Sequence, residues 1–194
     1  IISVRQKRQL GLGHAVLCAR EVIKNEPFAL MVGDDLMFSP DPGIRQLITV
    51  AEAESMAVVG VMPVPAHKVS SYGVIQGEEI GPDMYRVRGL QEKPSSGEAA
   101  SSLVIVGRYV LTQNVFEHLK DLVSSQPEGE IQLTEALQVM ARENRLLAVR
   151  LHGMRFDIGD WVDYLIANIY FGLQDEELRD DLVQRLHELV PPPV

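Results

Sequence analysis

Two adjacent carboxylates, Asp34 and Asp35, stand in the segment "LMVGDDLMF", residues 30–38. They follow the apolar run "FALMV", residues 28–32, after one glycine. A buried strand that ends on negative charge is typical of a site for a hard divalent cation, because such ions prefer oxygen ligands. Open α/β sheets bind ligands beyond the carboxyl ends of their strands, which is where this pair would lie. The alternative is that one aspartate caps the next turn and the other is solvated.

A third carboxylate, Asp157, closes a second apolar segment in "RFDIGDW", before a helix for which Asp160 is a candidate N-cap. Asp34 and Asp157 are far apart in the sequence. If their strands are neighbours in the sheet, the two side chains can converge on one metal ion. The pattern therefore favours a divalent cation site over two unrelated helix caps.

A glycine-containing turn, "QLGLGHAV", leads into a helical stretch. Gly11 and Gly13 allow the backbone to approach a flat or anionic ligand, and the helix N-terminus offers free amides. The nearby Gln6 has an amide that can read the edge of a base. Many ordinary turns share this pattern and bind nothing, so on its own the signal is weak.

The motif "LQEKP" places Glu92 and Lys93 at the end of a strand. Neighbouring side chains on a strand point to opposite faces, so the two are not expected to pair with each other. Glu92 can serve a hydroxylated ligand while Lys93 serves a phosphate. A solvated strand end is the plain alternative.

Composition restricts the class of protein. The 194 residues, 46% hydrophobic and 23% charged, predict one globular domain over residues 1–194, with a charged helical tail at 174–194. The net charge of -9 disfavours a nucleic-acid backbone as the main partner. A single cysteine, Cys18, cannot form an intramolecular disulfide, and we expect a cytoplasmic protein with neither a signal peptide nor a membrane span.

The elements that must position these residues alternate along the first third of the chain. Apolar runs predict strands at 1–4, 28–32 and 56–64, separated by helices at 14–24 and 41–55. This alternation indicates an α/β sheet with parallel strands and right-handed crossovers. The remaining expected elements are a hairpin over 72–94, strands at 102–111 and 146–153, and helices at 114–123, 131–144, 161–172 and 175–189.

Taken in order, the motifs "RQKRQLGLGHAV", "VGDDL", "SYGV", "LQEKP", "IVGRYVL", "GEIQLTEAL" and "FDIGDW" resemble the sugar-phosphate nucleotidyltransferases. The bacterial UTP:glucose-1-phosphate uridylyltransferases are the most similar branch. The resemblance implies a Rossmann-like, three-layer α/β/α fold of the GT-A type, with a mixed, mostly parallel sheet. It also implies Mg²⁺ as cofactor, UTP and glucose 1-phosphate as substrates, UDP-glucose as product, and a homo-oligomer.

The same resemblance implies roles for the catalytic and nucleotide-binding positions. Gln6 and Gly11 match residues that read the uracil ring. Asp34 and Asp157 match the two Mg²⁺ ligands, and Lys93 matches the lysine that neutralises the sugar phosphate. In the implied reaction, glucose 1-phosphate attacks the α-phosphorus of UTP in line and pyrophosphate leaves.

Other positions match the sugar site of the family. Gly73, Glu92 and Gly107 match residues that line the glucose. Glu130 matches a position near the sugar or an oligomer contact. Asp35 matches a variable position, and no role is assigned to it.

One part of the family pattern has no match in residues 1–194. The family opens with a strand and a glycine-rich loop that wraps the triphosphate. We therefore expect an N-terminally incomplete fold, and activity of this chain alone is an open question. Two alternatives stay open: a non-catalytic sugar-nucleotide-binding or assembly remnant of such an enzyme, and a glucose-1-phosphate thymidylyltransferase.

Overall fold

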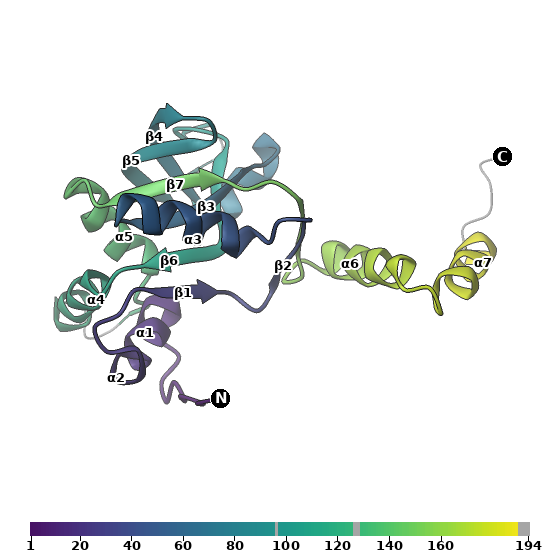
Figure 1. Cartoon of the computed structure of the whole chain (residues 1–194), viewed down its shortest axis with the longest axis horizontal. Coiled ribbons are helices and arrows are strands. Elements are labelled where there is room, and N and C mark those ends of the chain that lie inside the picture. Colours follow the sequence, from purple (N-terminus) through teal and green to yellow (C-terminus); the bar gives the residue numbers. More distant parts are fainter. Residues whose placement is uncertain (96, 126–128, 190–194) are drawn as a thin grey trace.

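The computed structural model describes residues 1–95, 97–125 and 129–189, and Figure 1 shows the arrangement of their elements. The strands are β1 Phe28–Met31, β2 Asp35–Phe38, β3 Ala57–Pro63, β4 Gly73–Gly81, β5 Met84–Glu92, β6 Leu103–Leu111, β7 Leu146–Arg150 and β8 Met154–Asp157. The helices are α1 Gly11–Cys18, α2 Arg20–Ile23, α3 Gly43–Glu54, α4 Asn114–Ser125, α5 Leu133–Arg142, α6 Trp161–Gln174 and α7 Arg179–Leu189, with a 3-10 turn η1 at Ala66–Ser71.

Six strands form the main sheet, in the order β1-β6-β3-β7-β5-β4, and β2 pairs with β8 in a separate two-stranded sheet. Within the described residues, β3 and β7 are the one parallel pair, and every other pairing is antiparallel. The expectation of a mostly parallel sheet is therefore wrong. An apolar run indicates that a strand is buried but not the direction of its neighbours. Strand β3 lies between the antiparallel β6 and the parallel β7, yet its sequence is the same as that expected for a strand in a parallel sheet.

Strand β1 shows the same error. The continuous apolar run at 28–32 is typical of a strand buried on both faces of a parallel sheet, but β1 pairs antiparallel with β6 at the edge of the sheet. Its side chains alternate between half-buried and exposed, and Met31 is 58% exposed. An edge strand with one covered face needs no second apolar face.

Helices cover both faces of the main sheet. One core cluster packs α1, α4 and α5 against the sheet, around the fully buried Leu119, Leu137 and Met140. The other cluster places Leu47 of α3 against the opposite face. Alternate residues of β3 enter the two clusters, with Val58 in one and Val59 in the other. The order of layers is thus helix, sheet, helix.

The first residues and the first helix differ from the expectation. Residues 1–4 form no strand, and within the described chain no strand pairs with them; Ile1 and Ile2 are exposed. A strand is held by ladder hydrogen bonds to a neighbour, so apolar character alone does not produce one. The helix expected at 14–24 begins earlier, at Gly11, and divides into α1 and α2 at Ala19.

A turn interrupts the strand expected at 146–153. Strand β7 ends at Arg150, and the chain turns at Gly153, which has a φ of 137°. A Cβ at Gly153 would lie 2.7 Å from the carbonyl oxygen of Phe38, so only glycine fits there without a shift. This turn directs β8 away from the main sheet and onto β2.

Helices α6 and α7 extend from the body on the side of the β2–β8 pair (Figure 1). Asp160 caps α6 as expected, because its Oδ1 accepts hydrogen bonds from the amides of Val162 and Asp163, each at 3.0 Å. The tail expected at 174–194 contains α7, while residues 190–194 lie outside the described part of the chain. Among the described helices, none is both long enough and apolar enough to cross a membrane.

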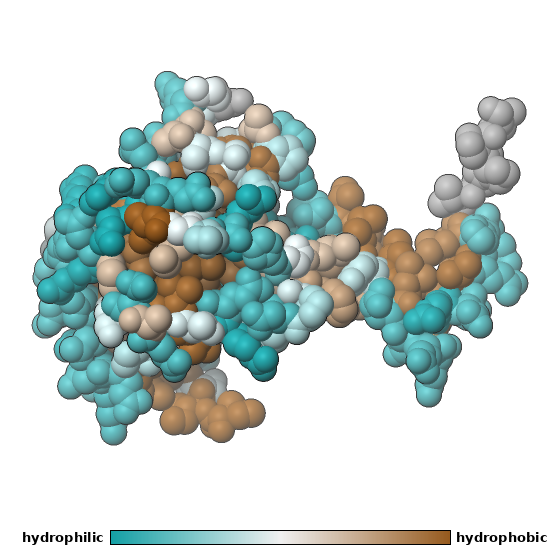
Figure 2. All heavy atoms as spheres, turned by 45° about the horizontal axis from the view of Figure 1, so that its top comes forward, coloured by the Kyte–Doolittle hydropathy of each residue, from teal (hydrophilic) through white to brown (hydrophobic). Residues whose placement is uncertain are grey.

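Apolar side chains are exposed along α6 and α7, where Figure 2 shows hydrophobic residues gathered on the extended arm. The largest exposed fractions on α6 belong to Trp161 at 81%, Val162 at 65% and Leu165 at 59%. No residue of α7 is buried. These helices therefore present a hydrophobic surface that the body of the chain does not cover.

Candidate active site

The β2–β8 pair brings the two loops that carry Asp34 and Asp157 together. Asp35, the first residue of β2, lies opposite Asp157, the last residue of β8. The amide of Ile158 donates to the carbonyl oxygen of Asp34 at 2.9 Å. A Cβ at Gly159 would lie 3.2 Å from Oδ1 of Asp157 and 3.8 Å from Oδ2 of Asp34. Both carboxylates thus border the same space, which the missing side chain of Gly159 leaves open.

This space fits a hard cation. Mg²⁺ is usually bound through one or two carboxylates, with substrate phosphates and water as its other ligands. Among the described residues there is no group of three or more Asp, Glu, His or Cys side chains that could hold a metal ion unaided. Asp34 and Asp157 therefore form the partial set of oxygen ligands that suits a metal ion shared with a phosphorylated substrate.

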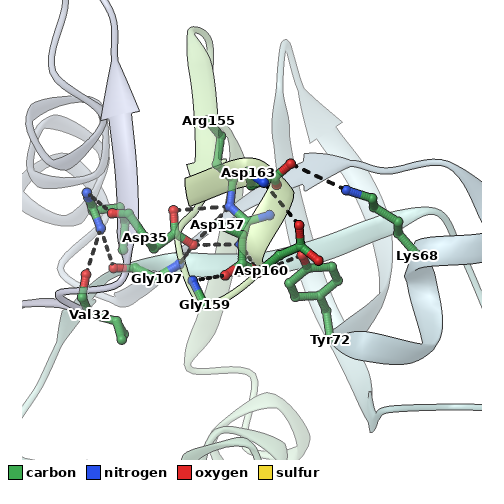
Figure 3. A network of polar contacts seen from close by, with 11 residues as sticks. Val32, Asp35, Lys68, Tyr72, Gly107, Arg155, Asp157, Gly159, Asp160 and Asp163 are labelled. Carbon is green, nitrogen blue, oxygen red and sulfur yellow. Dashed lines mark hydrogen bonds and ion pairs between the residues drawn. The ribbon is translucent and has the colours of Figure 1, made fainter. Parts of the chain in front are cut away.

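Asp35 has a different environment from its neighbour. Its side chain is 7% exposed and accepts hydrogen bonds from Nε and Nη2 of Arg155, the shortest at 2.7 Å. The amide of Gly107 donates to the same carboxylate at 3.0 Å. Burial lowers the pKa of Arg155, but the hydrogen bonds and charge of Asp35 outweigh it and hold that pKa above its usual value. Asp35 and Arg155 therefore form a buried ion pair, shown in Figure 3.

Tyr72, which lies between η1 and β4, contacts Asp157. Its hydroxyl donates to Oδ2 of Asp157 at 2.6 Å, and Cζ of Arg155 lies 4.9 Å from the centre of its ring. Burial, followed by the hydrogen bond to Asp157, raises the pKa of Tyr72, so the phenol keeps its proton. Sequence reasoning missed both Tyr72 and Arg155, although they stand inside the quoted motifs "SYGV" and "RFDIGDW".

Glu92 lies beside Gly73, as the hairpin places them opposite each other in β4 and β5. Thr134, near the start of α5, donates from Oγ1 to Oε2 of Glu92 at 2.6 Å. A Cβ at Gly73 would lie 3.3 Å from Oε2 of Glu92. The hydroxyl of Thr134 was also missed, although the quoted motif "GEIQLTEAL" contains it.

Lys93 follows β5 directly and has an exposed side chain. Its φ of 44° falls in the left-handed region, which non-glycine residues rarely adopt. The amide of Lys93 donates to the carbonyl oxygen of Tyr72 at 3.1 Å. Tyr72 therefore links the segment that carries Lys93 to Asp157, and the strained backbone is a mark often found at functional sites.

Gln6, Gly11 and Glu130 form a separate group. Nε2 of Gln6 donates to the carbonyl oxygen of Gly11 at 3.0 Å and lies 2.9 Å from Nδ1 of His14. Gly11 has a φ of 85°, and a Cβ there would lie 2.5 Å from Cγ of Glu130. The structure therefore places Glu130 beside the glycine turn of the first helix.

Gly107 lies on β6 against the other side of Asp35. A Cβ at Gly107 would lie 2.9 Å from the β-carbons of Asp35 and Val32. Two residues further along β6, Tyr109 is buried, and burial raises its pKa, with the negative charges of Asp35 and Glu92 adding to the effect. The contacts of Gly107 are thus with the buried ion pair, whereas Gly73 contacts Glu92.

Known proteins of similar sequence are nucleotidyl transferases. The family model described as nucleotidyl transferase matches residues 1–171. A UTP--glucose-1-phosphate uridylyltransferase of Bacillus subtilis (strain 168) is 40% identical over 187 residues, covering 96% of this chain and 64% of its own length.

Solved structures agree with the sequence match. A crystal structure of UDP-glucose pyrophosphorylase complexed with UDP-glucose has a TM-score of 0.80 at 37% identity, covering 87% of this chain and 64% of that one. A UTP-bound UGPase from Acinetobacter baumannii has a TM-score of 0.85 at 34% identity, covering 97% and 66%. The chain spans less than two thirds of the length of the Bacillus relative. By sequence and fold, this chain belongs to the nucleotidyl transferase family.

Proposed function

We propose that this chain serves uridylyl transfer from UTP to glucose 1-phosphate, which yields UDP-glucose and pyrophosphate. The observation that carries the proposal is the approach of Asp34 and Asp157 to the space at Gly159, from loops far apart in the sequence. The choice of UTP and glucose 1-phosphate is supported by the name of the Bacillus relative and by the solved structures of similar proteins with UDP-glucose or UTP bound.

Asp34 and Asp157 would hold Mg²⁺, which when bound supplies neutralisation of phosphate charge. Lys93, whose side chain is exposed next to this region, would bind the phosphate of the sugar. Positioning and charge neutralisation then account for catalysis, without a covalent intermediate on the enzyme.

Glu92 would accept hydrogen bonds from glucose hydroxyls. Thr134 already occupies Oε2 of Glu92, which fixes the orientation of the carboxylate before a sugar arrives. The missing side chain of Gly73 leaves room beside Oε2. A sugar that lacks the matching hydroxyl would leave an acceptor without a partner and bind less well.

The uracil ring would be read at the glycine turn, by Gln6 and the backbone at Gly11. The contact between Gln6 and Gly11 supports this, since it orients the amide within the turn. The roles of Gly107 in lining the sugar and of Glu130 near it stay predictions. A side chain at Gly107 would collide with Asp35 and Val32, so close packing is by itself enough to explain a glycine there.

A homo-oligomer fits the exposed apolar surface of α6. Its acidic residue, Asp163, forms an ion pair with Lys68 at 3.7 Å, so the surface carries little uncompensated charge. A second copy of a chain with a net charge of -9 would meet little repulsion there. Sedimentation equilibrium should show association that a Leu165→Asp substitution reverses.

The single domain over 1–194 and the cytoplasmic location stay predictions.

The decisive experiment measures Mg²⁺-dependent pyrophosphate release by this chain with UTP and glucose 1-phosphate. Asp157→Asn should abolish release, while Asp41→Asn, an exposed acidic control, should leave it unchanged. Binding of UDP-glucose is measured in parallel by calorimetry. Equal use of dTTP would favour the thymidylyltransferase alternative. UDP-glucose binding without release would favour the non-catalytic one, and neither binding nor release by folded protein would overturn the proposal.

A further inference from the structure

We infer that Tyr72 is a positioning residue for metal binding: with Arg155 it holds one oxygen of Asp157, so that the other oxygen faces Asp34 and the metal ion. This inference rests on the proposed function. Each oxygen of the Asp157 carboxylate then has a distinct task, and the Tyr72 hydroxyl, from the residue between η1 and β4, has a role in metal binding.

Oδ2 of Asp157 contacts both Tyr72 and Arg155. The hydroxyl of Tyr72 donates to Oδ2 of Asp157 at 2.6 Å, and Nη2 of Arg155 lies 3.5 Å from the same atom. Hydrogen-bond donors and a positive charge at Oδ2 occupy that oxygen and oppose the approach of a cation. Figure 3 shows Tyr72 and Arg155 converging on this carboxylate from different elements.

Oδ1 of Asp157 has a different environment. Oδ1 accepts a hydrogen bond from the amide of Gly159 at 3.2 Å, a bond that leaves further acceptor capacity on the oxygen. Oδ1 is also the atom nearest to the absent Cβ of Gly159, at 3.2 Å, and Oδ2 of Asp34 lies 3.8 Å from the same point. The oxygen of Asp157 that is open to a shared cation is therefore Oδ1.

Arg155 is itself held in place, which makes the arrangement rigid. Its Nε donates to Oδ1 of Asp35 at 3.1 Å, and its Nη2 donates to Oδ2 of Asp35 at 2.7 Å. Cζ of Arg155 lies over the ring of Tyr72. The side chain of Asp35 is 7% exposed and that of Arg155 is 12% exposed, so both are shielded from water. The ion pair with Asp35 and the contact with the Tyr72 ring thus both restrain the guanidinium of Arg155 that faces Oδ2 of Asp157.

The test uses Mn²⁺ as a probe, with free ion followed by electron paramagnetic resonance. Tyr72→Phe removes only the hydroxyl and should weaken Mn²⁺ binding by about tenfold, the usual size of the effect for a residue that orients a ligand. Tyr164→Phe, a hydroxyl deletion on α6, should leave it unchanged. The thermal unfolding midpoint of the metal-free protein should be nearly the same for Tyr72→Phe and wild type, which separates positioning from a general loss of structure.

A second arm isolates the path through Asp157. In an Asp157→Asn background, any residual Mn²⁺ binding should be insensitive to Tyr72→Phe. Wild-type affinity in Tyr72→Phe, or an equal loss with and without the Asp157 carboxylate, would overturn the inference alone. A wild-type chain whose Mn²⁺ binding does not depend on Asp157 would overturn the proposed metal site, and the inference with it.

Discussion

The two sides of the β2–β8 pair treat neighbouring aspartates in opposite ways. On the buried side, Asp35 is enclosed by Arg155 and the amide of Gly107. On the open side, Asp34 is exposed and borders the space at Gly159. The same residue type one position apart therefore forms a buried ion pair on one side and, on the other, is the proposed metal ligand. What separates them is the location of the counter-charge.

The largest expected effect comes from removing the buried charge. Asp35→Leu leaves the shielded guanidinium of Arg155 with only its longer contact to Asp157, which should lower the free energy of unfolding by about 3 kcal/mol. Asp34→Leu, the matched change on the open side, should alter it by less than about 0.5 kcal/mol. Urea unfolding followed by far-UV circular dichroism measures both. Equal losses would end the distinction between the two sides.

The second prediction removes both charges. In Asp35→Leu/Arg155→Met no buried charge is left, so most of the stability lost in the single variant should return, by about 2 kcal/mol or more. The same unfolding experiment gives the answer. If the double variant is no more stable than Asp35→Leu, hydrogen bonds to other groups, and not the ion pair, dominate this region.

The third prediction concerns the open side. Gly159→Ala places a methyl group 3.2 Å from Oδ1 of Asp157 and 3.8 Å from Oδ2 of Asp34, where the metal ion is proposed to bind. Mn²⁺ affinity should fall by about tenfold, with little change in thermal stability. Gly33→Ala is the control in the same region, because a Cβ there meets nothing within 4 Å. Unaltered affinity in Gly159→Ala would place the cation elsewhere.

The smallest expected effect is at the start of α6. Asp160→Ala removes the side chain that accepts hydrogen bonds from the amides of Val162 and Asp163, so the helix should lose about 1 kcal/mol. Asp160→Asn keeps the acceptor and should lose less. Chemical unfolding of both variants tests this, and a loss as large as that of Asp35→Leu would mean that the open side is as tightly built as the buried side.

The sequence predicts that Asp34 and Asp157 meet if the strands they close are neighbours, but the structure brings them together in another way. Strand β1, before Asp34, pairs with β6, whereas β2, after Asp34, pairs with β8. The hairpin of β4 and β5 could be predicted from the sequence, because the stretch "EEIGPD" ends in turn residues. The turn itself forms at Pro82 and Asp83, and the residues before them belong to β4. Strand direction was not readable: the apolar run of β3 is the same whether its partners run parallel or antiparallel.

The partner of Asp35 was also beyond reach. Arg155 lies 120 positions after Asp35 in the sequence. The residues around an arginine do not indicate which carboxylate it will pair with in the folded protein. Thr134 and Tyr72 were hidden for the same reason, because a single hydroxyl is recognisable only by what it touches. The roles assigned to the candidate residues stay predictions, since the structure shows their places and not their ligands.

The pairing of β2 with β8 also sets a limit on when the site can form during synthesis. Residues 35–38 leave the ribosome early, but their partners at 154–157 follow more than a hundred residues later. Until then Asp35 has no counter-charge, and Asp34 and Asp157 cannot share a ligand. Contacts of such long sequence separation form late, after local elements such as the β4–β5 hairpin have closed. A nascent chain should therefore acquire its metal affinity in one late step, after β8 has emerged.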